Sequence, residues 1–162
     1  MQKITPFLWF ADKAEEAMNF YVEVFNGAPR KNTESKVVSI LRYEQGMETP
    51  GMPAMEGKVL TGVFELDGQR FMCLDGGPAF QFNEAVSMLV ECEDQAEIDY
   101  FWDKLSTVPE SEQCGWLKDM YGVSWQIVPR DLGKIFENPK AINAMLSMKK
   151  LDIAALKAAA EA

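Results

Sequence analysis

Few side chains in this sequence have the chemistry of an ordinary catalytic centre. Its 162 residues include no histidine, which is the commonest general base near neutral pH and the commonest protein ligand for transition metals. This absence excludes Ser-His-Asp and Cys-His arrangements within one chain. Proton transfer or metal binding would have to come from other groups, of which the 25 carboxylates are the most numerous. No motif in the sequence predicts a catalytic residue.

The three cysteines, Cys73, Cys92 and Cys114, are far apart and odd in number. Cys73 and Cys92 lie in apolar segments typical of strands, where a free cysteine behaves as a small buried hydrophobe. Cys114 precedes a glycine and has no cationic residue directly beside it in the sequence that would activate it. We therefore expect reduced thiols in a cytoplasmic protein, without a disulfide framework or a cysteine-rich zinc site.

The balance of charge limits the partners that the protein can attract. The formal net charge is −9, and the densest basic pair is Lys149-Lys150, so we expect no nucleic acid and no anionic membrane as a partner. No apolar stretch reaches the roughly 18 residues of a membrane-spanning helix, and no signal peptide is recognised.

One pattern of elements occurs twice. An apolar strand leads into an Asp-x-x-Glu pair and an amphipathic helix, and a glycine turn into an aromatic strand follows later. The first copy has the strand 4–10 with Asp12 and Glu15, and the second has the strand 86–92 with Asp94 and Glu97. We expect Asp12 and Asp94 to cap their helices. Two such units in one domain usually close around a shared cleft, so the repeat predicts a binding site.

Further strands and turns lie between and after the helices. Residues 36–43 and 58–66 are typical of strands, and Asp67-Gly68 is a strong signal for a two-residue hairpin turn. A second hairpin is predicted around Tyr121-Gly122. Residues 46–57 are rich in Met, Pro and Gly, and form either a hairpin tip, which we favour, or a Met-lined lid over a cleft.

Beyond Pro129 the pattern changes to helix. Asn138 is an N-cap followed by Pro139 at the first helical position, and Asp152 is placed to cap a last, alanine-rich helix. This tail has no counterpart in the repeat. We therefore expect it to pack against the domain or to form a dimer contact.

Four segments of the chain resemble the PhnB-like family, some members of which are labelled 3-demethylubiquinone 3-methyltransferase. The segments are AEEAMNFYVEVF (14–25), FELDGQRFMCLDGGPAFQFNEAVS (64–87), CGWLKDMYGVSWQIVP (114–129) and MKKLDIAALKAA (148–159). The family is part of the glyoxalase/bleomycin-resistance/dioxygenase (vicinal oxygen chelate) superfamily. The methyltransferase label has no support in the residues, because no Gly-rich strand-to-helix turn of the nucleotide-binding kind is present.

The resemblance implies an α+β protein with two tandem βαβββ modules, each with a curved sheet around a cleft, and a C-terminal helical tail. It places a single glyoxalase-like domain at residues 1–130, with module one at 1–80 and module two at 81–130. The helical extension is then 131–162. It also implies a homodimer.

Enzymes of this superfamily hold a divalent metal with side chains from the first and last strands of each module. The matching positions here are Thr5, Met72, Ser87 (or Val86 if the register shifts by one) and Gln126, where the family pattern has His or Gln and Glu. This set contains no anionic ligand, and thioether and hydroxyl groups suit no common catalytic dication. We therefore predict no metal and no other cofactor at these positions.

Strand alternation separates the residues of the expected cleft from those that pack on the helices. The side chains predicted to bind a ligand are Thr5, Phe7, Trp9, Arg70, Met72, Ser87, Trp116, Ser124 and Gln126. This mixture of apolar rings and a few hydrogen-bonding groups is typical of a site for a small, partly apolar molecule. Plainer interpretations exist: Trp9 and Trp116 as core residues, Gln126 as a partner for backbone groups, and Arg70 as a solvated side chain.

Two functions from different classes follow. The first is metal-free binding of a small organic molecule, which the protein would sequester or sense, as bleomycin-resistance members of the superfamily do. The alternative is a metal-dependent lyase, isomerase or dioxygenase with a non-standard site built from carboxylates such as Asp75, Glu84 or Asp119.

Overall fold

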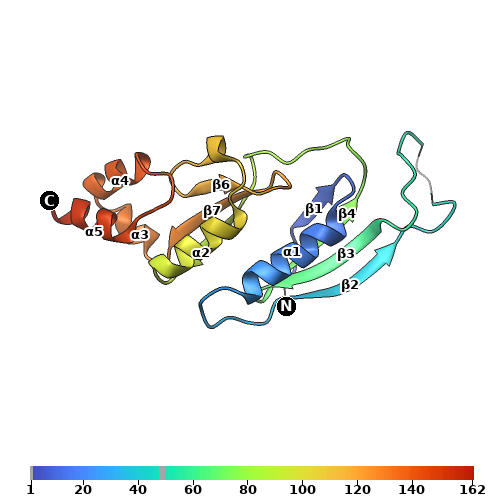
Figure 1. The fold of residues 1–162 in the computed structure, drawn as a ribbon, viewed down its shortest axis with the longest axis horizontal. Coiled ribbons are helices and arrows are strands. Elements are labelled where there is room, and N and C mark those ends of the chain that lie inside the picture. Colours follow the sequence, from blue (N-terminus) through green and yellow to red (C-terminus); the bar gives the residue numbers. More distant parts are fainter. Residues whose placement is uncertain (1, 48–49) are drawn as a thin grey trace. The chain divides into compact units, whose positions relative to one another are not determined.

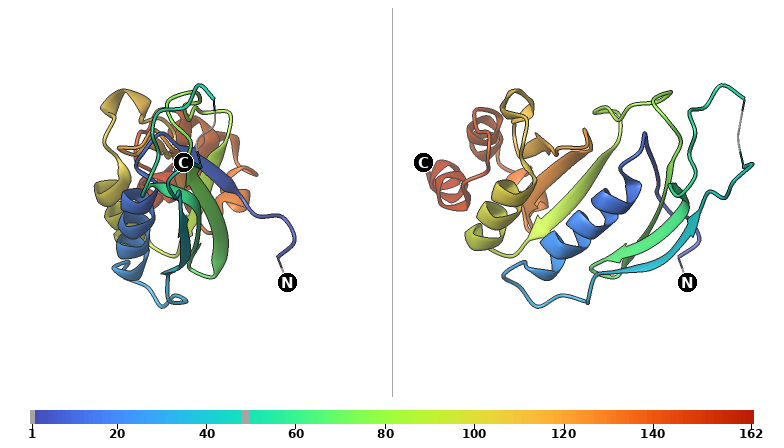
Figure 2. Two further views of the ribbon diagram at one scale, coloured as in Figure 1. Left: turned by 90° about the vertical axis from the view of Figure 1, so that its right-hand side faces the viewer. Right: turned by 45° about the vertical axis from the view of Figure 1, so that its right-hand side comes forward.

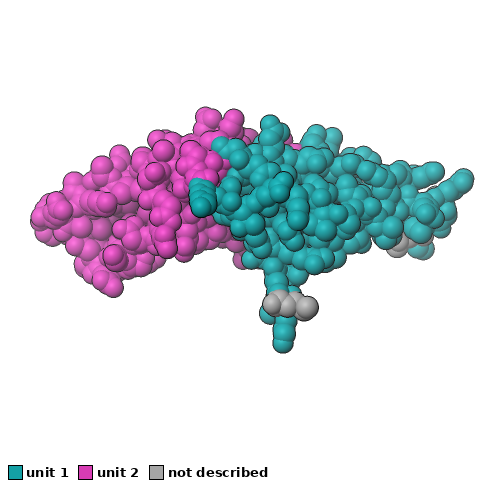
Figure 3. Space-filling model, turned by 90° about the horizontal axis from the view of Figure 1, so that it is seen from below, with its two compact units in different colours: residues 1–27, 31–82 teal, residues 28–30, 83–162 magenta. Residues whose placement is uncertain are grey.

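The structure is a computed structural model that describes residues 2–47 and 50–162. It forms two compact units, which Figure 3 shows in different colours. Unit 1 comprises residues 1–27 and 31–82, and unit 2 comprises residues 28–30 and 83–162. Among the described residues, no helix is both long and apolar enough to cross a membrane.

Unit 1 contains one helix and a mixed sheet. Its elements are β1 (Phe7–Phe10), α1 (Ala14–Asn26), β2 (Lys36–Arg42), β3 (Val59–Leu66) and β4 (Gln69–Asp75). The strand order is β1-β4-β3-β2, with β1 parallel to β4 and the other pairs antiparallel. The helix α1 covers one face of this sheet (Figure 2), which is the βαβββ arrangement predicted for module one.

Unit 2 repeats the plan with a smaller sheet and adds the C-terminal helices (Figure 1). Its elements are β5 (Ser87–Cys92), α2 (Gln95–Leu105), the 3-10 helix η1 (Pro109–Ser111), β6 (Trp116–Lys118), β7 (Ser124–Pro129), α3 (Leu132–Ile135), α4 (Pro139–Leu146) and α5 (Ile153–Glu161). The strand order is β5-β7-β6, with β5 parallel to β7. In the described part of this unit, η1 stands where module one has β2. Pro109 lacks the backbone N–H that a strand ladder needs.

The α+β class and the two-module plan are confirmed by these elements. The helix α1 forms because its apolar residues recur at helical spacing, and six of them are buried: Ala14, Ala17, Met18, Tyr21, Val24 and Phe25. The opposing sheet residue Phe64 is also buried, and its ring stacks on that of Tyr21 with centroids 6.4 Å apart.

The start of α1 differs from the prediction. Lys13 holds the N-cap position, and no side chain at that position makes a capping bond. Instead, the backbone N–H of Ala14 donates to Oδ1 of Asp75, at the end of β4, at 2.8 Å. The expected cap at Asp12 was therefore wrong, because a carboxylate from a distant strand accepts from the first N–H of the helix.

The start of α2 follows the prediction. Oδ1 of Asp94 accepts from the N–H of Glu97 at 3.0 Å, and Oε2 of Glu97 accepts from the N–H of Glu93 at 3.1 Å. Two backbone donors at the helix start are thus satisfied by side chains from the same turn.

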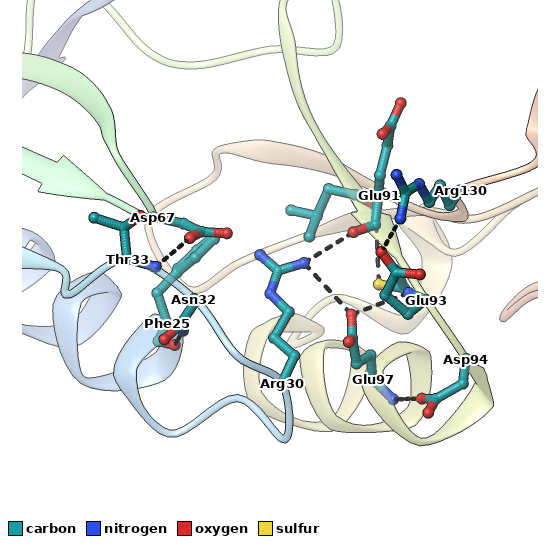
Figure 4. Close-up of polar contacts among 12 residues, drawn as sticks. Phe25, Arg30, Asn32, Thr33, Asp67, Glu91, Glu93, Asp94, Glu97 and Arg130 are labelled. Carbon is teal, nitrogen blue, oxygen red and sulfur yellow. Dashed lines mark hydrogen bonds and ion pairs between the residues drawn. The ribbon is translucent and has the colours of Figure 1, made fainter.

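The buried carboxylate of Glu97 also has a cationic partner, Arg30 (Figure 4). Nη1 of Arg30 lies 3.4 Å from Oε2 of Glu97 and donates to the carbonyl of Glu91 at 2.9 Å. The guanidinium lies 5.3 Å from the ring centroid of Phe101, a cation–π distance. The side chains of Arg30 and Glu97 are only 14% and 2% exposed, so this ion pair is largely removed from water.

Both predicted hairpins are present. Asp67 and Gly68 have φ angles of 48° and 83°, as a type I′ turn requires, and they join β3 to β4. Gly122 donates to the carbonyl of Asp119 at 3.1 Å and closes the turn between β6 and β7. The predicted tip or lid at 46–57 lies between β2 and β3, whose hairpin is closed by bonds between Tyr43 and its neighbours across the strands. Glu48 and Thr49 of that segment lie outside the described residues.

The C-terminal helices pack against the sheet of unit 2. Val128 of β7 forms a buried cluster with Met145, Leu151 and Leu156. The backbone also contributes, because the N–H groups of Cys114 and Gly115 donate to the carbonyls of Met148 and Lys149, each at 2.8 Å. The predicted caps are confirmed: Asn138 accepts from two backbone N–H groups of α4 and Asp152 from one of α5.

Candidate functional site

In unit 1, the predicted ligand-binding residues lie on the sheet face opposite α1. The parallel register pairs Phe7 with Met72 and Trp9 with Leu74. Paired residues share a face and alternate along each strand, and the intervening Leu8 and Phe10 are buried. Phe7, Trp9 and Met72 are therefore brought together as predicted, on a mainly apolar surface.

Thr5 and Arg70 lie at the edge of this face. Thr5 precedes β1 by two residues, and Arg70 is exposed two residues before Met72. The backbone of Arg70 exchanges two hydrogen bonds with the side-chain amide of Gln2, at 3.0 and 3.1 Å. Gln2 therefore holds the N-terminal segment beside β4, a contact that no sequence pattern predicts.

Trp9 is packed by the segment that follows β4. Its indole N–H donates to the carbonyl of Gly77 at 3.0 Å, and its ring meets that of Phe80 edge-on with centroids 5.0 Å apart. A Cβ atom on Gly76 would lie 2.2 Å from the indole, so only glycine fits there. Trp9 thus presents a fixed, half-buried surface.

In unit 2, three predicted residues meet on the sheet face opposite α2. The parallel register pairs Ser87 with Ser124 and Leu89 with Gln126. Nε2 of Gln126 donates to Oγ of Ser87 at 2.9 Å, and both side chains are half-buried. On the opposite face, Trp125 is buried. The sequence left Ser87 and Val86 as alternatives, and the register places Ser87 on the face with Gln126.

Trp116 completes this group, which we call the module-two polar face: Ser87, Trp116, Ser124 and Gln126. The antiparallel register pairs Trp116 with Gln126, so the half-buried indole flanks the amide. Leu89, on the other side of Gln126, is 50% exposed. The face therefore has hydrogen-bonding groups at its centre and apolar groups beside them.

The hydroxyl of Ser124 has a special position in this face. The residue is 1% exposed, and within the described part of the chain its Oγ atom has no hydrogen-bond partner. Leaving a buried hydroxyl without a partner is unfavourable by about 1–3 kcal/mol. A small polar group of a ligand or a water molecule that reached this hydroxyl would remove that penalty.

Lys118 belongs to the same face and is not among the residues predicted from the sequence. It pairs with Ser124 in the register, and its ammonium forms an ion pair with Glu84. The hydrogen bond from Lys118 lowers the pKa of Glu84. The period of two from Trp116 along β6 was the available signal for Lys118.

These faces do not fit a divalent metal. The positions that correspond to the superfamily's metal ligands hold Thr5, Met72, Ser87 and Gln126, which include no carboxylate, imidazole or thiolate. Hard cations need several oxygen ligands, usually with carboxylates among them, and zinc needs nitrogen, sulfur or carboxylate ligands. Within residues 2–47 and 50–162, no three Asp, Glu or Cys side chains form a cluster that could hold a metal.

Of the carboxylates considered as alternatives, Asp75 already has structural partners. It is 1% exposed, and its two oxygens accept from the N–H groups of Ala14 and Val59 at 2.8 and 2.9 Å. This arrangement joins the start of α1 to the start of β3. A general base or metal ligand would have to give up those bonds.

Asp119 and Glu84 are also engaged. Buried Asp119 accepts from the backbone N–H groups of Tyr121 and Val123, and from the indole N–H of Trp125 at 2.9 Å. It therefore stabilises the turn between β6 and β7. Glu84 is exposed and paired with Lys118.

The two buried thiols are unreactive. Burial, with a further contribution from the Asp75 carboxylate, raises the pKa of Cys73 to about 12. Burial, with a contribution from Glu97, likewise raises the pKa of Cys92 to about 12. Both stay protonated at neutral pH, so neither is a nucleophile or a thiolate ligand.

One hollow was not predicted. A cavity of about 520 Å³ in unit 1 is lined by residues within 12–19, at the start of α1, and by residues 56–59, with Asp75 among its walls. Five of its lining residues are acidic and two are lysines. The sequence could not show it, because these segments are adjacent only in the folded unit. We assign no ligand to it.

Comparisons with known proteins show the family of this chain and support its fold. A sequence model of the family described as 3-demethylubiquinone-9 3-methyltransferase matches residues 2–128. The chain belongs to this PhnB-like family. The matched range includes every predicted ligand-binding residue, from Thr5 to Gln126.

Two solved structures are similar to this chain, one in sequence and fold and the other in fold. The PhnB protein from Bacillus cereus, described as a 3-demethylubiquinone-9 3-methyltransferase, is 43% identical; the match covers 78% of this chain and 99% of that one, with a TM-score of 0.61. A protein from Pseudomonas aeruginosa shares the fold at 18% identity, with 80% and 98% coverage and a TM-score of 0.57. Among curated proteins, none matches this chain.

Proposed function

We propose that this PhnB-like protein binds a small, partly apolar organic molecule on the module-two polar face, without a metal ion. The observation that carries the proposal is the buried hydroxyl of Ser124, which has no hydrogen-bond partner among the described residues and lies in the same face as the Ser87–Gln126 pair. Buried polar groups are normally hydrogen-bonded, so a hydroxyl left in this state beside two other polar groups supports a polar guest at this place, either a polar group of a ligand or a water that a ligand could displace.

The chemistry of the face defines the ligand. Because Gln126 donates through Nε2 to Ser87, the hydroxyl proton of Ser87 is available to donate and Oε1 of Gln126 to accept. An adjacent donor and acceptor recognise an uncharged group such as a carbonyl, an amide or a hydroxyl. The indole of Trp116 and the exposed Leu89 provide the apolar contact that a small organic ligand needs.

The proposal excludes a methyl transfer that depends on a nucleotide-like cofactor. The turns from β1 to α1 and from β5 to α2 contain no glycine, and carry Asp12, Glu93 and Asp94 instead. Nucleotide-binding turns use glycines so that the backbone can approach the ligand. We therefore propose that this chain does not carry out the methyl transfer for which its family is named.

Native mass spectrometry of freshly purified, untagged protein tests the proposal. We expect an organic adduct that survives chelation by EDTA and that is lost in Gln126→Ala and Ser87→Ala. Nile red, an uncharged aromatic ketone, serves as the added probe. Its affinity should fall about tenfold in Ser87→Ala, since its ketone oxygen accepts from the Ser87 hydroxyl and one hydrogen bond lost to a buried partner corresponds to about 1–2 kcal/mol.

The matched controls are Gln45→Ala, an exposed glutamine in the β2–β3 loop, and Ser39→Ala, an exposed serine of β2. Both should leave adduct and probe binding unchanged. Retention of a stoichiometric divalent metal whose removal abolishes binding would contradict the proposal and return attention to the carboxylates. Equal Nile red affinity in wild type and Ser87→Ala would move the site away from this face.

Two further parts of the proposal concern assembly and location. The family resemblance leads us to propose a homodimer, and the free thiols of Cys73, Cys92 and Cys114 a reducing, cytoplasmic setting. The same native mass spectrum measures the oligomeric state, which should be a dimer.

A further inference from the structure

A second, smaller cavity lies in the C-terminal helices of unit 2. Its volume is about 140 Å³, and it is lined by residues of α3, α4 and α5 and of the turns before them. Ala141 and Leu156 form buried parts of its lining, and Ile135 and Ile153 are half-buried. An apolar cavity of about this volume, roughly 150 Å³, accommodates a benzene molecule in another protein. The space therefore suits one aromatic ring or a branched aliphatic group of similar size.

The charged residues of this cavity favour an anion. Lys134 and Lys157 are exposed at its rim, against the single carboxylate of Asp131. Among the residues that the structure describes, neither lysine has an ion-pair partner, in contrast to Lys118, Lys149 and Lys150. The rim thus carries a net positive charge in a chain whose formal charge is −9.

The remaining polar residue of the lining is already satisfied. The side chain of Asn138 caps α4 through the N–H groups of Lys140 and Ala141, and donates to the carbonyl of Ala160 at 3.1 Å. It holds α4 and α5 together and has little capacity left for a ligand. Recognition therefore depends on the apolar interior and the two ammonium groups.

We propose that this cavity binds a small monocarboxylate with one aromatic ring or a branched aliphatic group. The apolar group would fill the space between the helices, and the carboxylate would lie at the rim with Lys134 and Lys157. The site is separate from the module-two polar face, and it lies beyond residue 128, where the match to the family ends.

Benzoate is the probe for this site, measured by the chemical shifts of backbone amides in the full-length protein. We expect saturable shifts at residues 131–160 in the millimolar range. Benzyl alcohol, which keeps the ring and lacks the charge, should bind about threefold to tenfold more weakly, because two exposed ion pairs are lost. Benzylamine should bind more weakly still.

Two variants separate the apolar from the charged part of the site. Lys134→Gln with Lys157→Gln should reduce the affinity for benzoate to that for benzyl alcohol, whereas Lys3→Gln with Lys31→Gln, which changes the net charge equally, should not. Ala160→Leu should fill the cavity and abolish the shifts; leucine is a good helix former, and circular dichroism would check that α5 is intact. Should Ala160→Leu not fold, Ile153→Ala enlarges the cavity and should shift selectivity toward a larger acid.

Three outcomes would overturn the proposal. They are shifts confined to residues outside 131–160, equal affinity for benzoate and benzyl alcohol, and unchanged affinity in the double lysine variant. Gln126→Ala should leave the benzoate shifts at 131–160 intact, so failure here is distinguishable from failure of the proposed function.

Discussion

The two modules carry the same Asp-x-x-Glu signature and use it differently. In module two, Asp94 and Glu97 satisfy backbone donors at the start of α2. In module one, the corresponding Glu15 forms a surface ion pair with Arg42, and the cap comes from Asp75, 61 positions after Ala14. The local signal is complete in one copy and replaced by a long-range contact in the other. The start of α1 therefore depends on β4 being in place, and the start of α2 does not depend on a distant strand.

The sheet faces of the two modules differ in the same way. Module one presents Phe7, Trp9 and Met72, and its tryptophan is fixed by the segment that follows β4. Module two presents a hydroxyl–amide pair and a buried hydroxyl for which the described part of the chain offers no hydrogen-bond partner. A duplicated fold can thus keep its framework while one copy is mainly apolar and the other provides polar recognition.

The largest expected difference between the two modules comes from removing the Asp75 carboxylate, which accepts from the first N–H of α1. Asp75→Ala leaves two buried N–H groups, of Ala14 and Val59, without an acceptor. We expect a loss of about 3–5 kcal/mol in the free energy of unfolding, since each unsatisfied buried group costs about 1–3 kcal/mol. Urea denaturation measures it.

The matched variants are Asp12→Ala and Asp94→Ala. Asp12→Ala should change stability by less than about 0.5 kcal/mol, because it makes no capping bond, whereas Asp94→Ala should lose about 1 kcal/mol, as for an ordinary N-cap. Equal losses in Asp12→Ala and Asp75→Ala would show that the local signal caps α1 after all.

A second test compares the two glutamates of the signature. Glu97→Ala leaves the guanidinium of Arg30, whose side chain is 14% exposed, without its carboxylate partner. It also removes the acceptor of the Glu93 N–H. Breaking a buried ion pair by removing one partner costs about 3–5 kcal/mol, and we expect about 3 kcal/mol here.

Glu15→Ala is the matched change in module one. Both Glu15 and Arg42 are 46% exposed, so the expected loss is below about 1 kcal/mol. Because that pair is in solvent, 1 M NaCl should reduce its contribution further, while the Glu97 variant should be nearly insensitive to salt. Similar salt dependence in the two variants would be evidence against the buried character of the Arg30 contact.

The smallest effect concerns one buried thiol in each module. Cys73 and Cys92 have pKa values raised to about 12 from an ordinary value of 9.0, so the unfolded state loses its protons first as the pH rises. Their contribution to stability is complete below pH 9 and is lost progressively as the pH rises through about 12. At pH 10 the loss is about 1.4 kcal/mol for each thiol.

The measurement is the free energy of unfolding at pH 8 and pH 10. Cys73→Ala with Cys92→Ala should be less stable at pH 8, because two small cavities are created, but should show a weaker decline toward pH 10. An identical decline in the wild type and the double variant would assign the alkaline effect to other groups.

The sequence was most informative where structure depends on neighbouring residues. The type I′ turn at Asp67-Gly68, the cap at Asp94 and the tail caps at Asn138 and Asp152 all follow from short-range chemistry. Strand alternation also identified the residues that share each sheet face. Such features need only the periodicity and the φ preferences of a few residues.

Contacts between distant segments could not be predicted. The carboxylate of Asp75 was considered as a catalytic group, because nothing in its sequence neighbourhood shows that two N–H groups from other elements reach it. The ion pair of Arg30 with Glu97 and the bonds of Gln2 to Arg70 have no local signature either. The same holds for the cavity of the tail, whose lining comes from three short helices.

The packing of the tail on β7 and on the residues just before β6 has a consequence for folding during synthesis. Unit 1 needs no residue of its own beyond Phe82, whereas the core of unit 2 includes Leu156, which follows by 74 residues. At translation rates of about 5–20 residues per second, the two cores become complete about 4–15 s apart. During that interval Val128 is not covered by the tail helices. The nascent chain therefore passes through a state in which unit 1 is folded and unit 2 exposes apolar surface. A chaperone that binds apolar segments would act on this chain at that stage.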